Sequence, residues 1–337
     1  MNKVKVLITM PKRTYTRISK PNDIKELKSF AEVIMNIFDK KPSEDKLVEL
    51  ISEVDGCITS WGSPKITKRV VKSAKKLKII GHAAGSIKPY ICEEVFIKGI
   101  TVVHAAPIIA KPVAEFTLAL MLNCLRAIPQ HFIALKFKKN WNFRERKEKY
   151  TRDLKGKTIG IVGFGYVARE LVKLLEPFEV RILVYDPYVE HDKLKKYNAK
   201  KVSLEELLSN SDIVTIHAAL TEETRHMIGE RELKLLKPHA FIINTARGAI
   251  IDEKALIKAL KEKWIAGVAL DVYEREPLPE DSPLYELDNV ILTPHIAGAS
   301  GERISTLLST IIEEFKLFFE GKEPRYKIRY ERLKIMA

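Results

Sequence analysis

A glycine pattern near the middle of the chain limits the folds that this sequence can adopt. Residues Thr158–Val162 form a short apolar run, which leads into GFGYVA (163–168) and then into a helical pattern. A strand, a GxGxxA turn and a helix in this order form the context in which a dinucleotide pyrophosphate binds. Gly163 would make the tight turn, Gly165 would let the backbone approach the phosphates, and Ala168 would permit close helix–strand packing. The helix N-terminus would then face the phosphates.

The next strand-like segment indicates which dinucleotide binds. It ends at Tyr185 and is followed by Asp186, which lies about 20 positions after Gly163. A carboxylate at this spacing accepts hydrogen bonds from a ribose 2′-hydroxyl and would repel a 2′-phosphate. Because no arginine follows Asp186 closely, the pattern favours NAD over NADP. The alternative is a glycine turn with an unrelated capping aspartate.

Strand-like and helical segments alternate along most of the chain. A first series has strand-like segments at residues 4–9, 56–59 and 77–80, with helical patterns at residues 44–53 and 66–76. A second series has strand-like segments at residues 158–162, 181–185, 212–216, 240–243, 267–270 and 290–292. Two further helical patterns cover residues 113–127, which are apolar on most faces, and 302–320. This alternation predicts an α/β chain of two Rossmann-like or flavodoxin-like domains, each with a doubly wound parallel sheet.

Composition narrows the class of protein. The chain has 337 residues, enough for two domains, and 46% apolar with 30% charged residues is typical of a globular protein. No apolar run approaches the roughly 18 residues of a membrane span, and the apolar stretch at residues 6–8 is too short for a signal peptide. We therefore expect a cytoplasmic protein with no membrane partner. The cysteines and histidines show no disulfide or metal-ligand spacing, so no metal site is expected.

The net charge of +14 raises the question of an anionic partner. Lysines are spread along the whole sequence, and the densest basic segment, residues 136–147, also contains acids. No DNA- or RNA-binding signature accompanies this segment, so we expect no nucleic-acid partner. A solvated lysine and glutamate surface is one alternative, and attraction of a small anionic substrate is another.

Three polar residues follow the last three strand-like segments: Arg247, Glu276 and His295. Ligands of open α/β sheets bind beyond the carboxyl ends of the strands, so these residues are candidates for an active site. A planar guanidinium suits a substrate carboxylate. A histidine could give a proton to a developing alkoxide, and a neighbouring carboxylate would favour the imidazolium form. The set fits hydride transfer between a nicotinamide cofactor and a 2-oxo acid.

These motifs resemble those of the D-isomer-specific 2-hydroxyacid dehydrogenases, a family that includes phosphoglycerate dehydrogenase and glyoxylate/hydroxypyruvate reductase. The resemblance covers about residues 55–302. It is carried by LKGKTIGIVGFG (154–165), NTARG (244–248), LDVY (270–273) with EP (276–277), and TPH (293–295). It implies an NAD-dependent enzyme that interconverts D-2-hydroxy acids and 2-oxo acids, with a small anionic substrate. It also implies a homodimer built on the nucleotide domain.

The resemblance further implies a division of labour along the chain. Residues 1–106 together with 299–337 would form a discontinuous substrate-binding domain, and residues 107–298 would form the NAD-binding domain. Arg247 would anchor the substrate, His295 would be the acid/base, and Glu276 would be its partner. The residues expected at the cofactor are Gly163, Gly165, Tyr166, Val167, Asp186, Ala218, Ala219, Thr224, Thr245, Ala246, Arg247, Asp271, His295 and Gly298. The residues expected at the substrate are Trp61, Ala84, Gly85, Ser86 and Arg247.

The chain departs from the family in the loop that follows residues 77–80. It has GHAAGSIK (81–88) where the family usually has a G-V-G-x-D-N-like loop, and Lys88 replaces the usual acidic residue. Gly85 and Ser86 occupy the positions whose backbone N–H groups would hold the substrate carboxylate. His82 is a further candidate for substrate contact.

Two other departures bear on the substrate and the cofactor. Trp61 stands where phosphoglycerate dehydrogenases tend to carry an arginine for the phosphate, so we expect a non-phosphorylated, bulkier or more apolar substrate. Ala219 stands where the family commonly has proline, which should have a mild effect.

Two other functions are compatible with parts of this pattern. An NAD-sensing regulatory protein, like the transcriptional corepressors of the superfamily, could retain all three polar residues. A formate dehydrogenase shares the fold but usually replaces the acid of the triad, so Glu276 argues against it.

Overall fold

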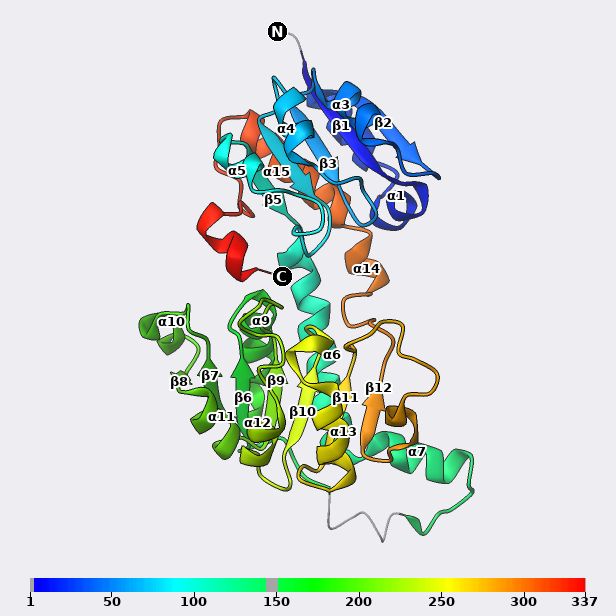
Figure 1. Cartoon of the computed structure of the whole chain (residues 1–337), viewed down its shortest axis with the longest axis vertical. Coiled ribbons are helices and arrows are strands. Elements are labelled where there is room, and N and C mark those ends of the chain that lie inside the picture. Colours follow the sequence, from blue (N-terminus) through cyan, green and yellow to red (C-terminus); the bar gives the residue numbers. More distant parts are fainter. Residues whose placement is uncertain (1–2, 144–150, 337) are drawn as a thin grey trace. The chain divides into compact units, whose positions relative to one another are not determined.

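The computed structural model describes residues 3–143 and 151–336 (Figure 1). The basic segment at residues 136–147 therefore lies partly outside the described residues. The chain divides into two compact units, one made of Met1–Ile109 with Ala299–Ala337 and the other of Ala110–Gly298. Each unit contains one parallel sheet with helices between its strands, which confirms the predicted α/β fold class.

The unit formed by residues 1–109 and 299–337 contains a five-stranded sheet in the order β2-β1-β3-β4-β5. Every neighbouring pair of strands is parallel. The strands are β1 (Val4–Pro11), β2 (Ala31–Phe38), β3 (Gly56–Thr59), β4 (Ile79–His82) and β5 (Thr101–His104). The helices are α1 (Lys12–Ile18), α2 (Asp23–Phe30), α3 (Glu44–Ile51), α4 (Lys68–Ser73), α5 (Glu94–Ile97), α14 (Gly301–Ile304) and α15 (Leu307–Phe319), followed by the 3₁₀ helix η5 (Tyr330–Ile335).

Two glycines let α15 lie directly on this sheet. A Cβ atom at Gly56 would lie 2.7 Å from the ring of Phe315, and one at Gly81 would lie 2.3 Å from Ile311. Both helix residues are fully buried. The C-terminal segment is thus part of the core of the unit that begins with β1.

The unit formed by residues 110–298 contains a seven-stranded sheet in the order β12-β11-β10-β9-β6-β7-β8. The strands are β6 (Thr158–Val162), β7 (Arg181–Tyr185), β8 (Ala199–Lys201), β9 (Ile213–Ile216), β10 (Phe241–Asn244), β11 (Gly267–Leu270) and β12 (Val290–Leu292). The α-helices of this part of the chain are α6 (Ala106–Arg126), α7 (Ile128–Lys136), α9 (Tyr166–Leu175), α10 (His191–Lys195), α11 (Leu204–Asn210), α12 (Glu230–Leu235) and α13 (Glu253–Lys261). Short 3₁₀ helices are η2 (Glu176–Phe178), η3 (Gly248–Ile250) and η4 (Pro283–Glu286).

The strand order of this second sheet creates a ligand site by topology alone. The chain moves from β6 to β7 and β8 in one direction and then returns to place β9 on the other side of β6. Loops after β6 and β9 therefore leave the sheet in opposite directions, and a crevice opens at the carboxyl ends of these strands. The GxGxxA turn follows β6 directly.

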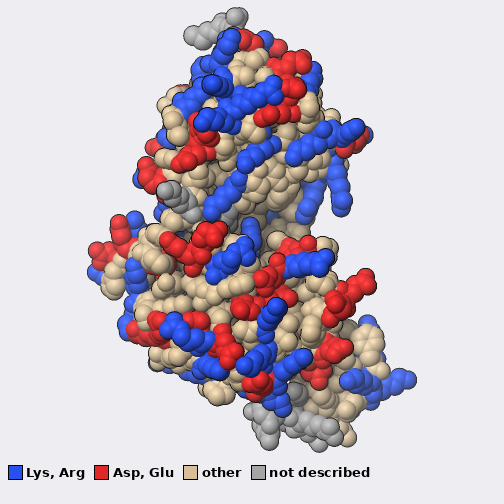
Figure 2. All heavy atoms as spheres, in the orientation of Figure 1, with Lys and Arg blue, Asp and Glu red and all other residues tan. Residues whose placement is uncertain are grey.

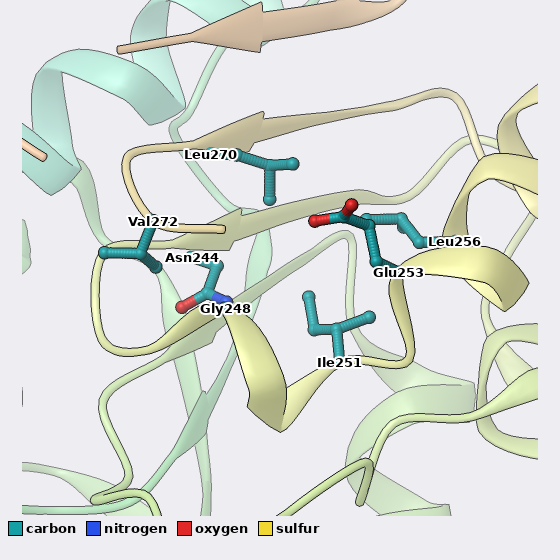
Figure 3. Close-up of a pocket in the computed structure, with 7 residues that line it drawn as sticks. All are labelled: Asn244, Gly248, Ile251, Glu253, Leu256, Leu270 and Val272. Atoms are coloured by element: carbon teal, nitrogen blue, oxygen red, sulfur yellow. The ribbon is translucent and has the colours of Figure 1, made fainter. Parts of the chain in front are cut away.

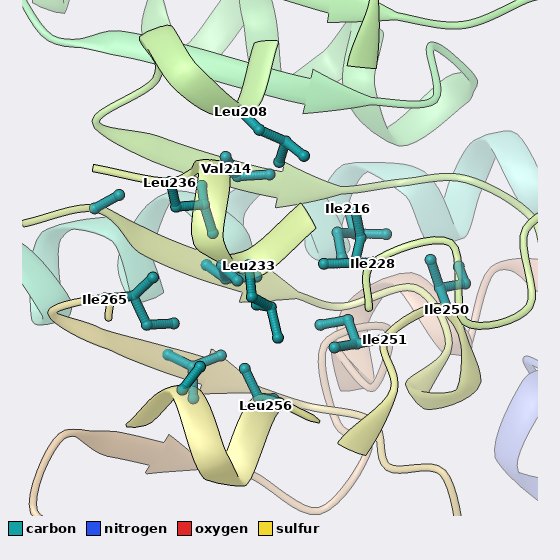
Figure 4. Close-up of a cluster of buried hydrophobic side chains, with 14 of the residues drawn as sticks. Leu208, Val214, Ile216, Ile228, Leu233, Leu236, Ile250, Ile251, Leu256 and Ile265 are labelled. Atoms are coloured by element: carbon teal, nitrogen blue, oxygen red, sulfur yellow. The ribbon is translucent and has the colours of Figure 1, made fainter. Parts of the chain in front are cut away.

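The seven-stranded sheet is held by apolar side chains from the helices that cover it. Figure 4 shows one such cluster, in which Leu208 of α11, Leu233 of α12 and Leu256 of α13 meet Val214 and Ile216 of β9. All five side chains are buried. Because close-packed cores resist displacement, the carboxyl ends of these strands are fixed points from which the site loops extend.

Three strands were not predicted from the sequence: β2, β5 and β8. All three lie at sheet edges, where a strand has a partner on one side only. Residues of β2 are mostly half-buried or exposed, and β8 has the sequence AKK, so neither shows the continuous apolar run of an interior strand. Strand β5 is four residues long.

Two predicted helices are shorter or broken. The helix predicted at residues 66–76 is α4, which begins after Thr67 because the Thr67 hydroxyl accepts a hydrogen bond from the Val70 N–H (3.4 Å). The helix predicted at residues 302–320 is interrupted between α14 and α15. There the hydroxyls of Ser305 and Thr306 donate to backbone carbonyls, at 2.9 and 2.7 Å, and so compete with helical hydrogen bonding.

Helix α6 begins earlier than the predicted 113–127 and carries Pro112 inside it. Although the sequence shows no uninterrupted apolar run of 18 residues, α6 is long and apolar enough, by length and composition, to cross a membrane. Half of that apolar window is buried inside the structure, and the core helix of a soluble protein passes the same test. Its buried residues Leu120, Met121 and Leu125 belong to the cluster that also contains Ile159 of β6.

Charges of both signs are interspersed on the surface. Figure 2 shows lysine and arginine side chains alternating with aspartate and glutamate over the face drawn. Many of them form exposed ion pairs within one helix or between neighbouring loops, such as Lys234 with Glu230 at 2.6 Å. Such pairs contribute little to stability individually.

Candidate functional site

Gly163 brings the loops after β6 and β9 into contact. Its φ is +86°, a conformation that glycine adopts readily, and its N–H donates to the Tyr185 carbonyl (2.8 Å). A Cβ at this position would lie 2.6 Å from the backbone of Ala218. The glycine is therefore required both by the turn and by the close approach of the loop that carries Ala218 and Ala219.

Gly165 leaves the start of helix α9 open. It is the N-cap residue of α9, and no side chain caps that helix end. A Cβ at Gly165 would meet nothing within 4 Å. Helix α9 begins at Tyr166 and Val167, and the first N–H groups of a helix together with its dipole favour an anion at this end. The turn fits a dinucleotide pyrophosphate.

Two backbone N–H groups fix the side chain of Asp186. One carboxylate oxygen accepts the Phe164 N–H (2.7 Å) and the other accepts the Tyr188 N–H (2.8 Å). Each oxygen has a second lone pair, which could accept from ribose hydroxyls. A second carboxylate is close, because the Tyr188 hydroxyl donates to Glu223 (2.7 Å), and this bond raises the pKa of Tyr188. The local negative charge fits NAD better than NADP.

The loop after β9 is organised by its own side chains. The Thr224 hydroxyl donates to the Ala219 carbonyl (2.6 Å) and accepts the Thr221 N–H (2.8 Å). His217 shares a hydrogen bond between Nε2 and the Thr215 hydroxyl (3.0 Å), and burial lowers its pKa to about 3. Thr224 and His217 therefore stabilise the loop that carries Ala218 and Ala219.

Arg247 lies in a turn that Asn244 closes. The Asn244 side chain accepts the Ala246 N–H (3.0 Å) and donates to the Arg247 carbonyl (3.0 Å), so it fixes the turn at the carboxyl end of β10. The Arg247 guanidinium is half-buried and donates to the Ala246 carbonyl (2.6 Å). Burial lowers the pKa of Arg247, and the charge of Glu276 acts in the opposite direction. Just before this turn, the Thr245 hydroxyl shares a hydrogen bond with Thr117 of α6 (3.1 Å).

Gly248 allows this turn to press against the loop after β11. A Cβ at Gly248 would lie 1.9 Å from the Tyr273 carbonyl carbon and 2.4 Å from the Glu274 nitrogen. Figure 3 shows Gly248 and Val272 facing each other across a small hollow that Asn244 and Glu253 also line. No other residue type could stand here without moving one of the two loops. The contact brings Glu276 within electrostatic range of Arg247.

The side chains of His295 and Glu276 are in direct contact. The His295 Nδ1 lies 2.7 Å from a carboxylate oxygen of Glu276. Because an ionised carboxylate only accepts, Nδ1 is the donor. The other carboxylate oxygen of Glu276 accepts the Tyr273 N–H (3.2 Å), which orients the acid. The pair borders a hollow that Tyr273, Tyr285 and Leu292 also line.

Asp271 holds the loop that carries His295. Its carboxylate is buried and accepts from the Thr293 hydroxyl (2.6 Å) and from the N–H groups of Ile296 (2.9 Å) and Ala297 (2.8 Å). His295 itself has φ +54°, which is uncommon for a non-glycine residue and needs support from its surroundings. Asp271 supplies that support, a role that the sequence did not reveal.

The remaining candidates of this unit lie on the same loops. Ala246 belongs to the Arg247 turn and is half-buried, and Gly298 is the half-buried last residue of the unit. Thr245 is buried. The structure therefore brings Arg247, Glu276 and His295 together at the carboxyl ends of β10, β11 and β12, as the sequence predicted for strands that end at one edge of a sheet.

The four substrate candidates outside Arg247 belong to the other unit and follow β3 and β4. Trp61 is half-buried, and the guanidinium of Arg17 lies 5.5 Å from the centre of its ring. Ala84 is fully buried, whereas Gly85 and Ser86 are half-buried. A Cβ at Gly85 would make only an ordinary contact, at 3.7 Å, with Ile109.

Two residues that organise these loops were not singled out from the sequence. The Tyr90 hydroxyl accepts the Gly62 N–H (3.1 Å), and the Ser60 hydroxyl donates to the Ala83 carbonyl (2.8 Å). Neither tyrosine nor serine forms a recognisable pattern at these positions. A signal for such contacts would require knowledge of which loops meet.

Comparison with known proteins identifies the family. Residues 118–297 match the family described as D-isomer specific 2-hydroxyacid dehydrogenase, NAD binding domain. The chain is 37% identical to glyoxylate reductase of Thermococcus litoralis over 320 residues, which cover 93% of this chain and 95% of that protein. It is 40% identical to D-3-phosphoglycerate dehydrogenase of Methanocaldococcus jannaschii over 282 residues, which cover 83% of this chain but only 52% of that longer protein.

Solved structures agree with the sequence relatives. A crystal structure of a protein from Pyrococcus horikoshii OT3 superposes with a TM-score of 0.82 at 29% identity, covering 99% of this chain and 100% of that one. A glyoxylate reductase from Paecilomyes thermophila gives a TM-score of 0.78 at 25% identity, covering 98% of this chain and 100% of that one. The chain therefore belongs to the D-isomer-specific 2-hydroxyacid dehydrogenase family, which acts on small 2-hydroxy and 2-oxo acids, and it is an NAD-dependent enzyme of that family.

Proposed function

We propose that the protein reduces a 2-oxo acid to a D-2-hydroxy acid, with Arg247 as carboxylate anchor, His295 as acid/base and Glu276 as the partner of His295. The observation that carries this proposal is the 2.7 Å contact between His295 Nδ1 and the Glu276 carboxylate. It commits Nδ1 to the carboxylate and leaves Nε2 as the nitrogen that exchanges a proton with substrate.

Each residue has one task in the reduction. Bound NADH supplies the hydride that the keto carbon receives. The Arg247 guanidinium binds the substrate carboxylate through paired N–H donors, which fixes the orientation of the neighbouring carbonyl. The N–H groups of Gly85 and Ser86 are the carboxylate donors that the resemblance implies for the substrate-binding unit. His295 gives its Nε2 proton to the carbonyl oxygen as negative charge develops there, and Glu276 holds the ring and stabilises its charged form. Oxidation of the hydroxy acid runs through the same steps in reverse.

We assign the two halves of this chemistry to the two units. Residues 107–298 bind NAD through Gly163, Gly165 and Asp186, and residues 1–106 with 299–337 bind the substrate. The remaining cofactor candidates lie in the first turn of α9 and on the loops after β9, β10, β11 and β12. These four strands are parallel, so their carboxyl ends lie at one edge of the seven-stranded sheet. A cytoplasmic location stays a prediction of the sequence.

The substrate is expected to be non-phosphorylated. Trp61 offers an apolar ring where an arginine would favour a phosphate, and the cation next to it, Arg17, already lies against that ring. The relatives named glyoxylate reductase support small 2-oxo acids as the first candidates to test. NADH oxidation should be measured with glyoxylate, hydroxypyruvate, pyruvate and longer 2-oxo acids, and the reverse reaction with 3-phosphoglycerate.

Two substitutions test the catalytic assignment. Arg247→Ala should lower kcat/KM for the best 2-oxo acid by about 100-fold or more, since an anchor lost from a half-buried site is worth about 3 kcal/mol. His295→Asn should lower kcat by about 100- to 10,000-fold, the usual contribution of a positioned acid. NADH binding, measured by fluorescence, is the control that shows an intact nucleotide site. Near-normal turnover of either variant would remove the role assigned to that residue.

The alternative function is an NAD-sensing regulatory protein. Such a protein could also carry Arg247, Glu276 and His295, so these residues alone do not distinguish it from an enzyme. This alternative predicts tight NADH binding and no turnover of any acid in the panel, whereas the proposed reductase turns over at least one of them.

We also propose that the protein forms a homodimer through the nucleotide unit. Helix α7 presents exposed apolar side chains that single globular chains usually bury: Ile128, Phe132, Ile133 and Leu135, with Phe137 directly after the helix. A second copy of this chain is the occupant that a self-complementary apolar patch of this kind suits. Analytical ultracentrifugation measures the stoichiometry.

A further inference from the structure

Two buried histidines end neighbouring strands beneath the loop of residues 84–86. His82 is the last residue of β4 and His104 is the last residue of β5, and the two are register partners. Their exposed fractions are 0% and 2%. The steps assigned above to Arg247, Glu276 and His295 use neither of them. A histidine that is buried this completely usually forms hydrogen bonds.

The two ring nitrogens of His82 have different surroundings. Its Nδ1 shares a hydrogen bond with the Thr59 hydroxyl (3.0 Å), and its ring lies 4.7 Å from the ring of Tyr90. Its Nε2 is buried and has no hydrogen-bond partner of normal geometry among the residues that the structure describes. An unsatisfied buried donor is destabilising. A small adjustment of the neighbouring loop would remove this cost.

Both imidazoles approach the backbone of that loop. Burial and the nearby His104 lower the pKa of His82 to about 3, and the Ser86 backbone acts in the opposite direction as a hydrogen-bond acceptor. Burial lowers the pKa of His104 to about 4, and the Gly85 backbone acts in the opposite direction in the same way. The two rings are therefore neutral at physiological pH, and each faces the backbone of a different residue of the loop.

The same histidines connect to the loop that carries Trp61. Tyr90, whose ring packs on His82, accepts the Gly62 N–H through its hydroxyl (3.1 Å). Both loops expected at the substrate thus depend on one buried polar layer under the ends of β3, β4 and β5. A displacement of His82 would therefore shift both loops.

We propose that His82 and His104 are positioning residues that hold Gly85 and Ser86 so that their N–H groups receive the substrate carboxylate. The imidazole N–H groups give the carbonyls of this loop a partner, and the amide N–H groups remain for the ligand. A neutral imidazole does this without adding a buried positive charge beneath the loop. This inference rests on the proposed function.

Steady-state kinetics of the full-length protein distinguish positioning from simple structural support. His82→Leu and His104→Leu should each raise KM for the best 2-oxo acid by about tenfold or more, as expected for a loss of about 1.4 kcal/mol in carboxylate binding. NADH affinity should be unchanged, and kcat should change by less than about threefold. His82→Gln, which keeps a side-chain N–H, should recover most of the lost affinity.

Ile80→Ala is the matched control. Ile80 lies on the same strand as His82, is fully buried and belongs to the apolar cluster that contains Leu47 and Val70. It should lower the free energy of unfolding with little change in KM. An equal rise in KM for Ile80→Ala, or a wild-type KM in both histidine variants, would overturn the inference.

Hydrogen–deuterium exchange of a peptide covering residues 83–90 gives a readout that does not need turnover. The histidine variants should exchange faster than wild type at Gly85 and Ser86, and Ile80→Ala should not. If the wild-type protein reduces no acid, the proposed function fails, and exchange still decides whether the histidines order the loop. Unchanged exchange in both histidine variants would contradict the inference whatever the activity.

Discussion

At the scale of single residues, Arg247 uses few of its hydrogen-bond donors. Its guanidinium is half-buried, donates one hydrogen bond to the Ala246 carbonyl and has Glu276 as a neighbouring charge. A guanidinium carries five N–H donors, and burial of unused donors is costly. A carboxylate supplied by a ligand would satisfy two of these donors at once, which is why we place the substrate anchor here.

Gly248 is the residue that makes this arrangement possible, and it leads to a specific prediction. In Gly248→Ala the added Cβ would overlap the backbone of Tyr273 and Glu274, at 1.9–2.4 Å, so one loop must move. Since Glu276 and Arg247 lie on opposite sides of this contact, we expect kcat/KM to fall by about 100-fold, the effect of a displacement of about 1 Å at a catalytic group. Steady-state kinetics and a crystal structure of the variant would measure both effects.

Gly301→Ala is the control for this substitution. A Cβ at Gly301 would meet nothing within 4 Å, and its φ is not positive, so the change should leave activity intact. Wild-type kcat/KM in Gly248→Ala would show that the close approach of the two loops is not needed for catalysis.

How far the site could be predicted from the sequence depends on the kind of residue. Arg247, Glu276 and His295 could be found because polar residues that follow parallel strands must lie at one edge of a sheet. The anchoring role of Asp271 could not, because its partners, Ile296 and Ala297, lie about 25 residues away in a loop of irregular conformation.

At the scale of helices and strands, burial decided which elements could be predicted. Interior strands such as β6 and β9 are buried at every position and appear in the sequence as apolar runs. The edge strands β2 and β8 are less buried and were missed, whereas the edge strand β12 was predicted from its apolar run. Helix ends set by side-chain hydrogen bonds, such as the start of α4 at Thr67, depend on a local competition that periodicity does not report.

Helix α7 carries the prediction that belongs to this scale. Phe132 is 52% exposed on α7, and the aromatic ring of Phe137, 67% exposed, lies 5.8 Å from it. In the proposed dimer these rings are buried, so Phe132→Asp would place a charge in an apolar interface. We expect the dimer dissociation constant to rise by about 100-fold or more, since an unpaired buried charge costs about 3–5 kcal/mol. Sedimentation equilibrium measures this constant.

Ile97→Asp is the matched control for the dimer. Ile97 is 71% exposed on α5 in the other unit, so its substitution tests whether any exposed apolar residue has the same effect. NADH binding of Phe132→Asp should stay near wild type, because the side chain is exposed and no cofactor candidate lies on α7. A Phe132→Asp protein that remains dimeric at low micromolar concentration would exclude α7 as the interface.

At the scale of the whole molecule, the chain keeps a high positive charge outside and neutral histidines inside. The formal net charge is +14, whereas His82, His104 and His217 have pKa values lowered to about 3, 4 and 3. The first two lie in the unit that begins with β1, and His217 lies in the seven-stranded unit. Acidification therefore acts on both units through groups that the folded state cannot protonate easily.

The direction of the resulting pH dependence follows from linkage. Above the unfolded histidine pKa of about 6.5, both states are deprotonated and these residues have no effect. Below it, the unfolded chain binds protons that the folded chain does not, so the free energy of unfolding falls until the pH approaches the folded-state values of about 3 to 4. His82 and His104 should each contribute a slope of at most about 1.4 kcal/mol per pH unit between pH 6 and pH 4.

Urea unfolding at a series of pH values, followed by tryptophan fluorescence and by circular dichroism, tests this expectation. His82→Gln and His104→Gln should each flatten the dependence, because glutamine does not titrate, even if the variants are less stable at pH 7. An exposed histidine, His191, is the control, and His191→Gln should leave the slope unchanged. If the slopes of the two buried variants equal the wild-type slope, carboxylates rather than buried histidines govern the loss of stability in acid. That result would also mean that both imidazoles become positively charged in the folded protein as readily as in the unfolded chain, so they would not be the neutral donors proposed beneath the loop of residues 84–86.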